Sequence, residues 1–368
     1  MTIPTAPDLG LAPDPALDRL LEAMPKAELH LHLDGSVRVG TALELARSRG
    51  VDAPLTWRGM FDALVAPMPC VDQAELLKAF DLPIALMQDA EALERITVEL
   101  IETKAAENVR YVEIKWGPLL HVAKGLSLED GIEAVVRGAE DAAARTGTVV
   151  RLVATALRSH DPAHNVRLAE AASRFRDRGL TGWDLAGPEA AFPDPLAHGQ
   201  AFDVARAGGL RITVHAGEWN GAAQVWRALE VGPERIAHGQ SAADDDSLIA
   251  ELRERGVCLD LCPTSNYQAG DVPSLAEHGL ALLHRAGAPV TLSTDDTTVS
   301  DVSLTEEYGR ALRDIRLTLP ELWAIDRFAL EVAFADEATL APLRLEFDAW
   351  AAGIPELAST EGTVAGAT

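Results

Sequence analysis

Short apolar runs alternate with longer stretches of helical periodicity through most of the chain. In Ala27–Leu33 the leucines alternate with charged and polar residues, and a helical pattern through Ala42 and Leu45 follows. This order predicts a strand followed by a helix. The pattern recurs and predicts seven more strands, at Val109–Trp116, Val149–Ala154, Gly182–Ala186, the stretch that begins at Arg211, Arg235–His238, Val257–Leu261 and Val290–Ser293. Helical patterns between them include residues 128–146, 163–178, 195–208 and 222–229.

Repeated units of strand and helix favour a parallel sheet covered by helices, and eight units close it into a barrel. We therefore predict an α/β fold, a (β/α)8 TIM barrel, and keep an open doubly wound sheet as the alternative. The barrel is expected to be a single domain over residues 25–351, with extra C-terminal helices to about Trp350. Residues 1–24 are expected to form an N-terminal extension. The tail at 352–368, rich in Ala, Gly and Thr, is predicted to be disordered.

The segment 50–107 after the first strand is long for a simple loop. Its pattern predicts three helices, at Trp57–Leu64, Gln73–Leu82 and Ala90–Ala106. An insertion at this point of a barrel lies over its mouth, so we expect a helical lid. Its apolar residues Phe61, Leu64 and Met68 are candidates for a pocket wall or for packing within the insertion.

The chain is strongly acidic, with a formal net charge of −25 and a sequence pI of about 4.7. This charge disfavours nucleic acid and anionic membrane surfaces as partners and favours a small neutral substrate. No apolar run approaches the roughly 20 residues that span a bilayer, and residues 1–24 carry no secretion signal, so we predict a cytoplasmic protein. The three cysteines, Cys70, Cys258 and Cys262, form no C-x-x-C pair and suggest neither disulfides nor a thiolate metal site. The pattern leaves the oligomeric state open.

Four residues of types that commonly bind metal ions fall at the ends of predicted strands. They are His30 and His32 in the first strand, His215 in the fifth and Asp295 after the eighth. Residues two apart in a strand share a face, so both first-strand imidazoles point the same way. Strands 8 and 1 are neighbours in a closed barrel and strand 5 faces them, which lets the four converge. Three nitrogens and a carboxylate suit one Zn²⁺ ion with a position left for water.

Three further polar residues lie close to these candidate ligands. Glu218 follows His215 by three residues, and its carboxyl group, if shielded from water, can stay protonated and donate to a ring nitrogen. His238 ends the sixth strand and is placed to hold a water molecule or take its proton. Asp296 follows Asp295 and can accept a hydrogen bond from the attacking oxygen. The three residues are our candidates for catalysis.

Six blocks of this sequence, in order and at matching spacing, resemble the adenosine deaminase family. They are Glu28–Ser36, Asp184–Gly187, Thr213–Glu218, Ala237–Gly239, Cys262–Asn266 and Ser293–Asp296. The resemblance extends from about residue 25 to residue 310 and implies a zinc-dependent barrel in which water replaces the 6-amino group of a purine.

The resemblance also implies a role for each site residue. It makes His30, His32, His215 and Asp295 ligands of one zinc per chain. It makes Glu218 the proton donor to purine N1, and His238 and Asp296 the partners of the water that attacks. Gly187 would meet the ring near N3, and Asp34 would bind a sugar hydroxyl. With His32 and Asp296, these two residues form the implied substrate-binding set.

Two departures from the family pattern concern the substrate. Pro188 stands after Gly187 where many relatives have Asp, and Trp219 follows Glu218 where small residues are common. In the adenine-specific branch of the family the position of Asp34 is usually Glu, so Asp34 favours a nucleoside. Adenosine or deoxyadenosine is the first expectation. Aminodeoxyfutalosine, adenine and N6-substituted adenine compounds remain alternatives.

Two functions of other classes also remain open. A binuclear amidohydrolase would need a bridging ligand, often a modified lysine, near the end of the fourth strand, and Gly182–Gly187 contains none. A barrel that only binds its ligand would have lost a metal ligand or the proton donor, and every such residue is present.

Overall fold

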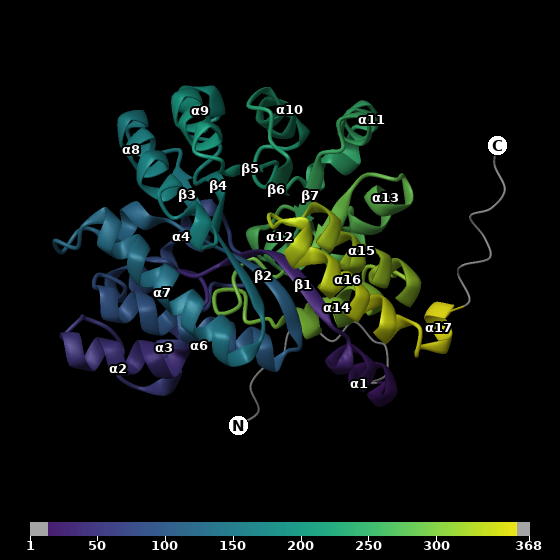
Figure 1. The fold of residues 1–368 in the computed structure, drawn as a ribbon, viewed down its shortest axis with the longest axis horizontal. Coiled ribbons are helices and arrows are strands. Elements are labelled where there is room, and N and C mark those ends of the chain that lie inside the picture. The colour runs from purple at the N-terminus through teal and green to yellow at the C-terminus, as the bar shows by residue number, and fades with distance from the viewer. Residues whose placement is uncertain (1–13, 359–368) are drawn as a thin grey trace.

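Eight parallel strands form the centre of the molecule, and helices surround them (Figure 1). The computed structural model describes residues 14–358. The strands are β1 Lys26–His32, β2 Val109–Trp116, β3 Val149–Leu157, β4 Leu180–Ala186, β5 Arg211–Ala216, β6 Arg235–His238, β7 Cys258–Leu261 and β8 Val290–Leu292. They pair in the order of the chain from β1 to β8. The predicted α/β barrel of the TIM type is confirmed.

Two places in the barrel are held by few backbone contacts. Strands β4 and β5 pair only at Gly182 with Arg211 and at Trp183 with Ile212. Strands β8 and β1 meet at a single bridge between Leu31 and Asp295, where the Asp295 N–H donates to the carbonyl oxygen of His30 at 3.0 Å. We call these two places the seams of the barrel.

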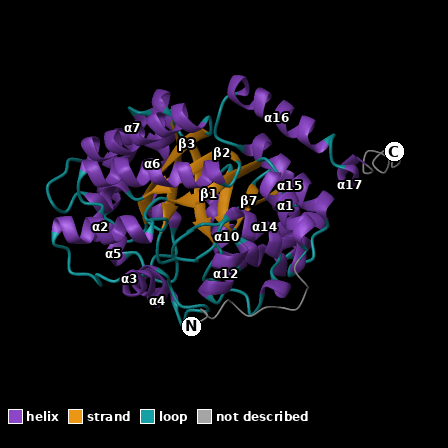
Figure 2. Cartoon of the chain, turned by 90° about the horizontal axis from the view of Figure 1, so that it is seen from below, coloured by secondary structure: helices purple, strands orange, loops and turns teal. Residues whose placement is uncertain are grey.

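Helices cover the outer face of the sheet, as Figure 2 shows around the central strands. The helices are α1 Pro15–Ala23, α2 Val39–Arg49, α3 Trp57–Leu64, α4 Gln73–Lys78, α5 Asp81–Leu86, α6 Ala90–Ala106, α7 Leu128–Thr146, α8 Pro162–Ser173, α9 Gly199–Ala207, α10 Ala222–Glu230, α11 Asp246–Arg255, α12 Pro263–Ala269, α13 Leu280–Arg285, α14 Leu304–Arg313, α15 Leu319–Val332, α16 Glu337–Ala351 and α17 Pro355–Ala358. None of them, in the described range, has the length and apolar character needed to cross a bilayer.

The alternation in β1 separates two faces as predicted. Leu29 packs outward against Ala329 and Leu330 of α15, and all three are buried. His30 lies on the opposite face, inside the barrel, because adjacent strand residues point to opposite sides. The apolar positions of β1 therefore anchor the strand and leave its polar positions for the interior.

Charged side chains occupy part of the barrel interior. Arg235 of β6 forms ion pairs with Glu113 of β2 and, at 3.0 Å, with Asp260 of β7, and all three side chains are fully buried. Lys115 of β2 lies 3.6 Å from Asp184 of β4 and is equally buried. Because each of these buried charges has a partner of opposite sign, the attraction within the pairs offsets part of the free-energy cost of removing the charges from water.

The insertion after β1 differs from the prediction in two respects. Residues 73–82 form parts of two helices, since α4 ends at Lys78 and α5 begins at Asp81. Pro83 explains the break, because a residue without an N–H fits the first turn of a new helix and not the interior of a continuous one. Helix α6 belongs to the barrel wall, where its buried Lys104 forms an ion pair with Glu28 of β1 at 3.2 Å. Helices α2 to α5 gather on one side of the molecule (Figure 2).

Both ends of the described chain carry helices. In the N-terminal extension, α1 buries Leu21 and its Asp18 lies 3.3 Å from Arg313 of α14. At the other end, α17 forms within the segment predicted to be disordered, and Leu357 is buried. The prediction of a disordered tail from residue 352 is therefore wrong for its first part. Residues 359–368 lie outside the described range.

Candidate active site

The four predicted metal ligands converge at the C-terminal end of the barrel. The Nε2 atoms of His30, His32 and His215 lie 3.1–3.2 Å from one another. The Oδ1 atom of Asp295 lies 3.0 Å from His30 Nε2 and 3.4 Å from His32 Nε2. The side chains come from β1, from β5 and from the loop after β8, so the closure of the barrel brings them together.

These distances fit a tetrahedral zinc site. Ligands about 2.05 Å from a zinc ion are roughly 3.3 Å apart at tetrahedral angles. The five distances above are close to this separation, so one zinc ion could contact all four ligand atoms. Three ring nitrogens that face one another at 3.1 Å cannot all be satisfied by hydrogen bonds, since each neutral imidazole carries a single N–H. A cation among them resolves this conflict.

His238 lies just outside this group. A wider set of His30, His215, His238 and Asp295 also has ligand atoms within 4.8 Å of one another. However, His238 Nε2 is 3.8 Å from Asp295 Oδ2, longer than any of the edges involving His32. We therefore keep His32 as the candidate ligand and place His238 beside the site.

The surroundings of His30, His32 and His238 favour the neutral form of their rings. Burial lowers the pKa of His30 well below its usual value, and burial lowers the pKa of His32 to about 4. His238 has a pKa of about 3, again chiefly because of burial. Neutral rings carry the free lone pair that a metal ion needs.

A second layer of polar residues holds the candidate ligands. Asp184 Oδ2 of β4 lies 2.8 Å from His215 Nδ1, and Ser265 Oγ donates to Asp295 Oδ2 at 2.7 Å. Cys262 Sγ lies 3.5 Å from His30 Nδ1. Such partners fix the ring orientation and tautomer of metal-binding histidines. Sequence reasoning gave these three residues no role, although each stands in a block that resembles the family.

Glu218 faces His238 across the site, with Oε1 3.8 Å from His238 Nε2. Burial raises the pKa of Glu218 well above its usual range, and the carboxylates of Asp295 and Glu189 add to the effect. A raised pKa favours the protonated carboxyl group, which is the form that the proton-donor role predicted from the sequence requires.

The turn after β8 brings Asp296 against the loop after β1. A Cβ atom on Gly35 would lie 1.6 Å from Asp296 Oδ1, so glycine is required at that position. Burial and the neighbouring Asp295 carboxylate raise the pKa of Asp296 well above its usual value. Asp295 and His238 both adopt left-handed backbone conformations, with φ of 66° and 65°. Non-glycine residues in this region carry strain, which is found most often at functional sites.

A pocket of about 360 Å³ opens next to these residues. Asp34, Gly187 and Asp296 line it together with His32 and Glu218. Its apolar walls come from α4 and α5, from the loop after β2 and from β3, and they include Leu76, Leu77, Phe80, Ile84, Leu120 and Leu157.

The lid residues singled out from the sequence do not line this pocket. Leu64 is buried in the main core, and the ring of Phe61 stacks on Trp57 at 5.3 Å. Trp219 and Pro188, which depart from the family pattern, do line the pocket. Trp219 also packs in the same apolar cluster as Phe80, so the loop after β5 meets the lid helices.

The lining of the pocket contains no cation. Within the described residues, neither lysine nor arginine contributes to it, whereas Asp34, Glu218, Asp295 and Asp296 do. Asp34 accepts a hydrogen bond from the Gly117 N–H at 3.2 Å, and burial raises its pKa to about 6. Gly187 has a φ of 104°, a conformation that favours glycine, and it presents its backbone to the pocket.

Comparisons with known proteins agree with this geometry. The sequence profile of the family described as adenosine deaminase matches residues 25–350. An adenosine deaminase of Clostridium perfringens is 36% identical over 325 residues, which cover 88% of this chain and 97% of that protein.

Two solved structures are also similar. The N6-methyl-AMP deaminase of Arabidopsis thaliana superposes with a TM-score of 0.80 at 30% identity, and the match covers 90% of this chain and 98% of that one. An amidohydrolase of Burkholderia ambifaria, solved with bound zinc, superposes with a TM-score of 0.85 at 27% identity, covering 94% and 96%.

Proposed function

This chain belongs to the adenosine deaminase family, and we propose that its substrate is a purine nucleoside. The proposed reaction converts adenosine or deoxyadenosine and water to inosine or deoxyinosine and ammonia. The coarser activity follows from the family itself: the protein is a hydrolase that acts on the amidine C–N bond of a purine. The proposal concerns the substrate, the metal and the residues that carry the reaction.

The absence of a cation from the pocket carries the choice of substrate. In the described residues, four carboxyl groups and no lysine or arginine line it. A phosphate or carboxylate on the substrate would lose its hydration without gaining a charged partner, which is costly. A neutral nucleoside avoids this cost, and Asp34 offers an oxygen to a sugar hydroxyl. The charge of the pocket therefore favours adenosine over AMP, N6-methyl-AMP and the carboxylate-bearing aminodeoxyfutalosine.

The metal proposal is one Zn²⁺ ion held by His30, His32, His215 and Asp295. Its support is the near-tetrahedral set of distances and the zinc in the Burkholderia ambifaria relative. A zinc ion in such a site lowers the pKa of a water molecule from 15.7 to about 7.

The residues of the chain divide the remaining work. Glu218 holds a proton on its buried carboxyl group and donates it to ring N1, which makes C6 more electrophilic. His238 and Asp296 orient the water that adds to C6, and the neutral His238 ring accepts one proton from that water. Gly187 positions the ring through its backbone, and Asp34 binds the sugar. The proton held by His238 then passes to the amino group, and the C6–N bond breaks to release ammonia. The remaining proton of the added water returns to Glu218 as the C6 carbonyl forms.

A substrate screen followed by absorbance tests this proposal. The compounds are adenosine, deoxyadenosine, adenine, AMP, N6-methyladenosine, N6-methyl-AMP and aminodeoxyfutalosine. We expect kcat/KM for adenosine to exceed that for AMP by at least about 100-fold, because the phosphate has no partner in the pocket. Faster turnover of AMP or N6-methyl-AMP would contradict the nucleoside assignment.

Metal analysis separates this proposal from a binuclear hydrolase. We expect one tightly held zinc per chain, and two would favour the binuclear alternative. The cytoplasmic location stays a prediction from the sequence.

A further inference from the structure

A second cavity lies at the opposite end of the barrel from the candidate active site. Its volume is about 870 Å³, larger than that of the catalytic pocket. It is lined by the first residues of β3, β4 and β5 and by the segment Phe334–Asp336 before α16. We call it the basal cavity.

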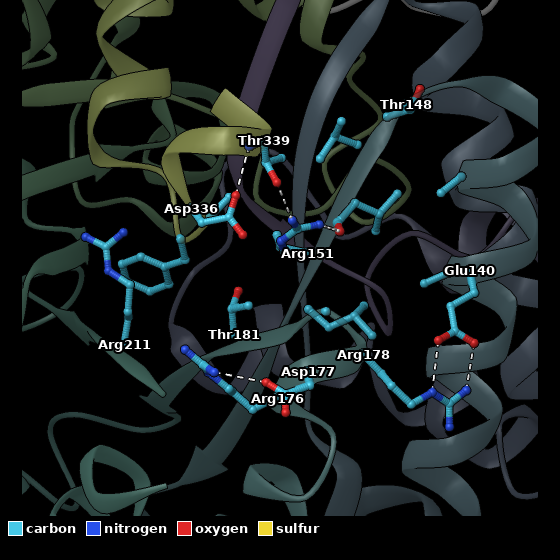
Figure 3. Close-up of a pocket in the computed structure, with 18 of the residues that line it drawn as sticks. Glu140, Thr148, Arg151, Arg176, Asp177, Arg178, Thr181, Arg211, Asp336 and Thr339 are labelled. Carbon is cyan, nitrogen blue, oxygen red and sulfur yellow. Dashed lines mark hydrogen bonds and ion pairs between the residues drawn. The ribbon is translucent and has the colours of Figure 1, made fainter. Parts of the chain in front are cut away.

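Four arginines line the basal cavity: Arg151, Arg176, Arg178 and Arg211. Figure 3 shows Thr181 between Arg151, Arg176 and Arg211. Such a cluster is notable in a chain whose net charge is −25. The three carboxylates that also line the cavity are Glu140, Asp177 and Asp336.

Two of the arginines are committed to structural ion pairs. Arg178 binds both carboxylate oxygens of Glu140, at 2.6 and 2.9 Å, and reaches Glu133 at 2.6 Å. Arg211 lies 2.6 Å from Glu234 and covers the ring of Phe334 at 4.6 Å. These ion pairs leave Arg178 and Arg211 with few N–H groups free to bind a ligand.

The other two arginines are available. Arg151 donates to the hydroxyl of Thr339 at 3.1 Å and to the carbonyl of Val150 at 2.9 Å. The pKa of Asp336, which also lines the cavity, is lowered chiefly by hydrogen bonds with Thr339 and less by the charge of Arg151, and within the described residues Arg151 forms no ion pair at 4.0 Å or less. Within residues 14–358, Arg176 forms an ion pair only with the adjacent Asp177, whose side chain is 88% exposed. An exposed pair of this kind is weak and is easily exchanged for another anion.

The floor of the cavity offers a hydroxyl group. Thr181 Oγ1 is buried and has no hydrogen-bond partner among the described residues. Guanidinium groups and a free hydroxyl are the donors that bind phosphate oxygens, since arginine can bind two oxygens at once.

We propose that the basal cavity binds a small phosphate-bearing molecule, with Arg151 and Arg176 as its charged contacts and Thr181 as its hydroxyl donor. The strands that begin at this cavity end at the active site, β4 at Asp184 to Ala186 and β5 at His215. The proposal does not depend on the function proposed above, because phosphate binding is measured without turnover.

Calorimetric titration of the full chain tests the proposal. The probes are inorganic phosphate, pyrophosphate and ribose 5-phosphate, with chloride at equal ionic strength as the reference. We expect one molecule to bind per chain and pyrophosphate to bind more tightly than phosphate, because two phosphates can reach two arginines. Tight binding of ribose 5-phosphate relative to phosphate would identify an organic phosphate as the natural ligand.

Charge-neutral variants locate the binding. Arg151→Gln and Arg176→Gln should each weaken pyrophosphate binding at least about tenfold, the loss expected from one charge-assisted contact. Arg227→Gln, which removes an exposed arginine of α10, is the matched control and should leave affinity unchanged. Arg176 is 55% exposed, so its variant should fold even if Arg151→Gln does not. Absence of binding to the wild-type protein at millimolar concentrations, or wild-type affinity in both variants, would overturn the proposal.

Discussion

Gly35 packs directly against the carboxylate of Asp296 in the site. The two lie 261 positions apart in the chain, yet a single added carbon atom would overlap the carboxylate. The loop after β1 therefore sets the position of the acid proposed to orient the attacking water. Steric contacts of this kind transmit errors of less than an ångström directly to the reacting atoms.

Replacement of Gly35 tests this dependence. In Gly35→Ala the new Cβ must displace Asp296, and we expect kcat for adenosine to fall about 100-fold. Gly40→Ala is the matched control, since a Cβ at Gly40 meets nothing within 4 Å. Steady-state kinetics and thermal melting of both variants make the measurement. An active Gly35→Ala protein would show that Asp296 is not needed where it lies.

Glu218→Gln removes the proton and keeps the shape of the side chain. We expect kcat to fall by about 100-fold or more, the usual contribution of a general acid, while zinc content stays at the wild-type level. Metal analysis and single-turnover kinetics on the same sample separate the two effects. Turnover close to wild type would exclude Glu218 as the proton donor.

At the scale of elements, short apolar runs between stretches of helical periodicity located all eight strands, although nearly every residue of most of these strands is buried. Boundaries were less accurate where a single residue changes the backbone, as at Pro83 between α4 and α5. The wall of the pocket was also missed. Leu77 and Phe80 have the same helical spacing as core residues, and only the packing of the segment α4–α5 over the barrel shows that they line the pocket.

The same limit applies to the residues around the site. The candidate ligands His30, His32 and His215 were identifiable because a strand end in a barrel points to the centre. Asp184 was not, because a carboxylate at a strand end does not reveal from sequence that it will meet a histidine of the next strand at 2.8 Å.

Helix α15 is tied to β1 through Asp326, which accepts hydrogen bonds from the Ala27 N–H at 2.9 Å and from the Tyr308 hydroxyl at 2.6 Å. Burial raises the pKa of Asp326 from 3.8 to about 7. The folded state therefore holds the proton more tightly than the unfolded state. This stabilisation is fully present below pH 4 and is lost as the pH rises through 7.

We expect the wild-type protein to lose up to roughly 4 kcal/mol relative to Asp326→Asn between pH 4 and pH 8. Urea unfolding of both proteins across this range measures the difference. A constant difference would mean that Asp326 does not titrate in the folded protein.

At the scale of the whole molecule, buried ion pairs connect opposite sides of the barrel. Arg235 joins β6 to Glu113 of β2 and to Asp260 of β7 below the site. Removing the cation would leave the buried carboxylates of Glu113 and Asp260 with hydrogen bonds but without an ion-pair partner among the described residues.

Arg235→Met should therefore lower the free energy of unfolding by about 3–5 kcal/mol. Arg58→Met removes an exposed ion pair with Asp62 and should cost less than about 1 kcal/mol. Urea titration of the two variants compares them. Equal losses would show that the barrel does not depend on the buried pairs.

The seams of the barrel stand directly beside the four candidate ligands. His30, His32 and Asp295 flank the seam between β8 and β1, and His215 and its partner Asp184 flank the seam between β5 and β4. An ion bound by all four ligands would link strands β1–β4 to strands β5–β8, which share few backbone hydrogen bonds at the two seams. Chelation should then speed amide exchange in β4 and β8 more than in β2. Equal amide exchange rates in these strands after chelation would mean that the two halves of the barrel stay together without the metal ion.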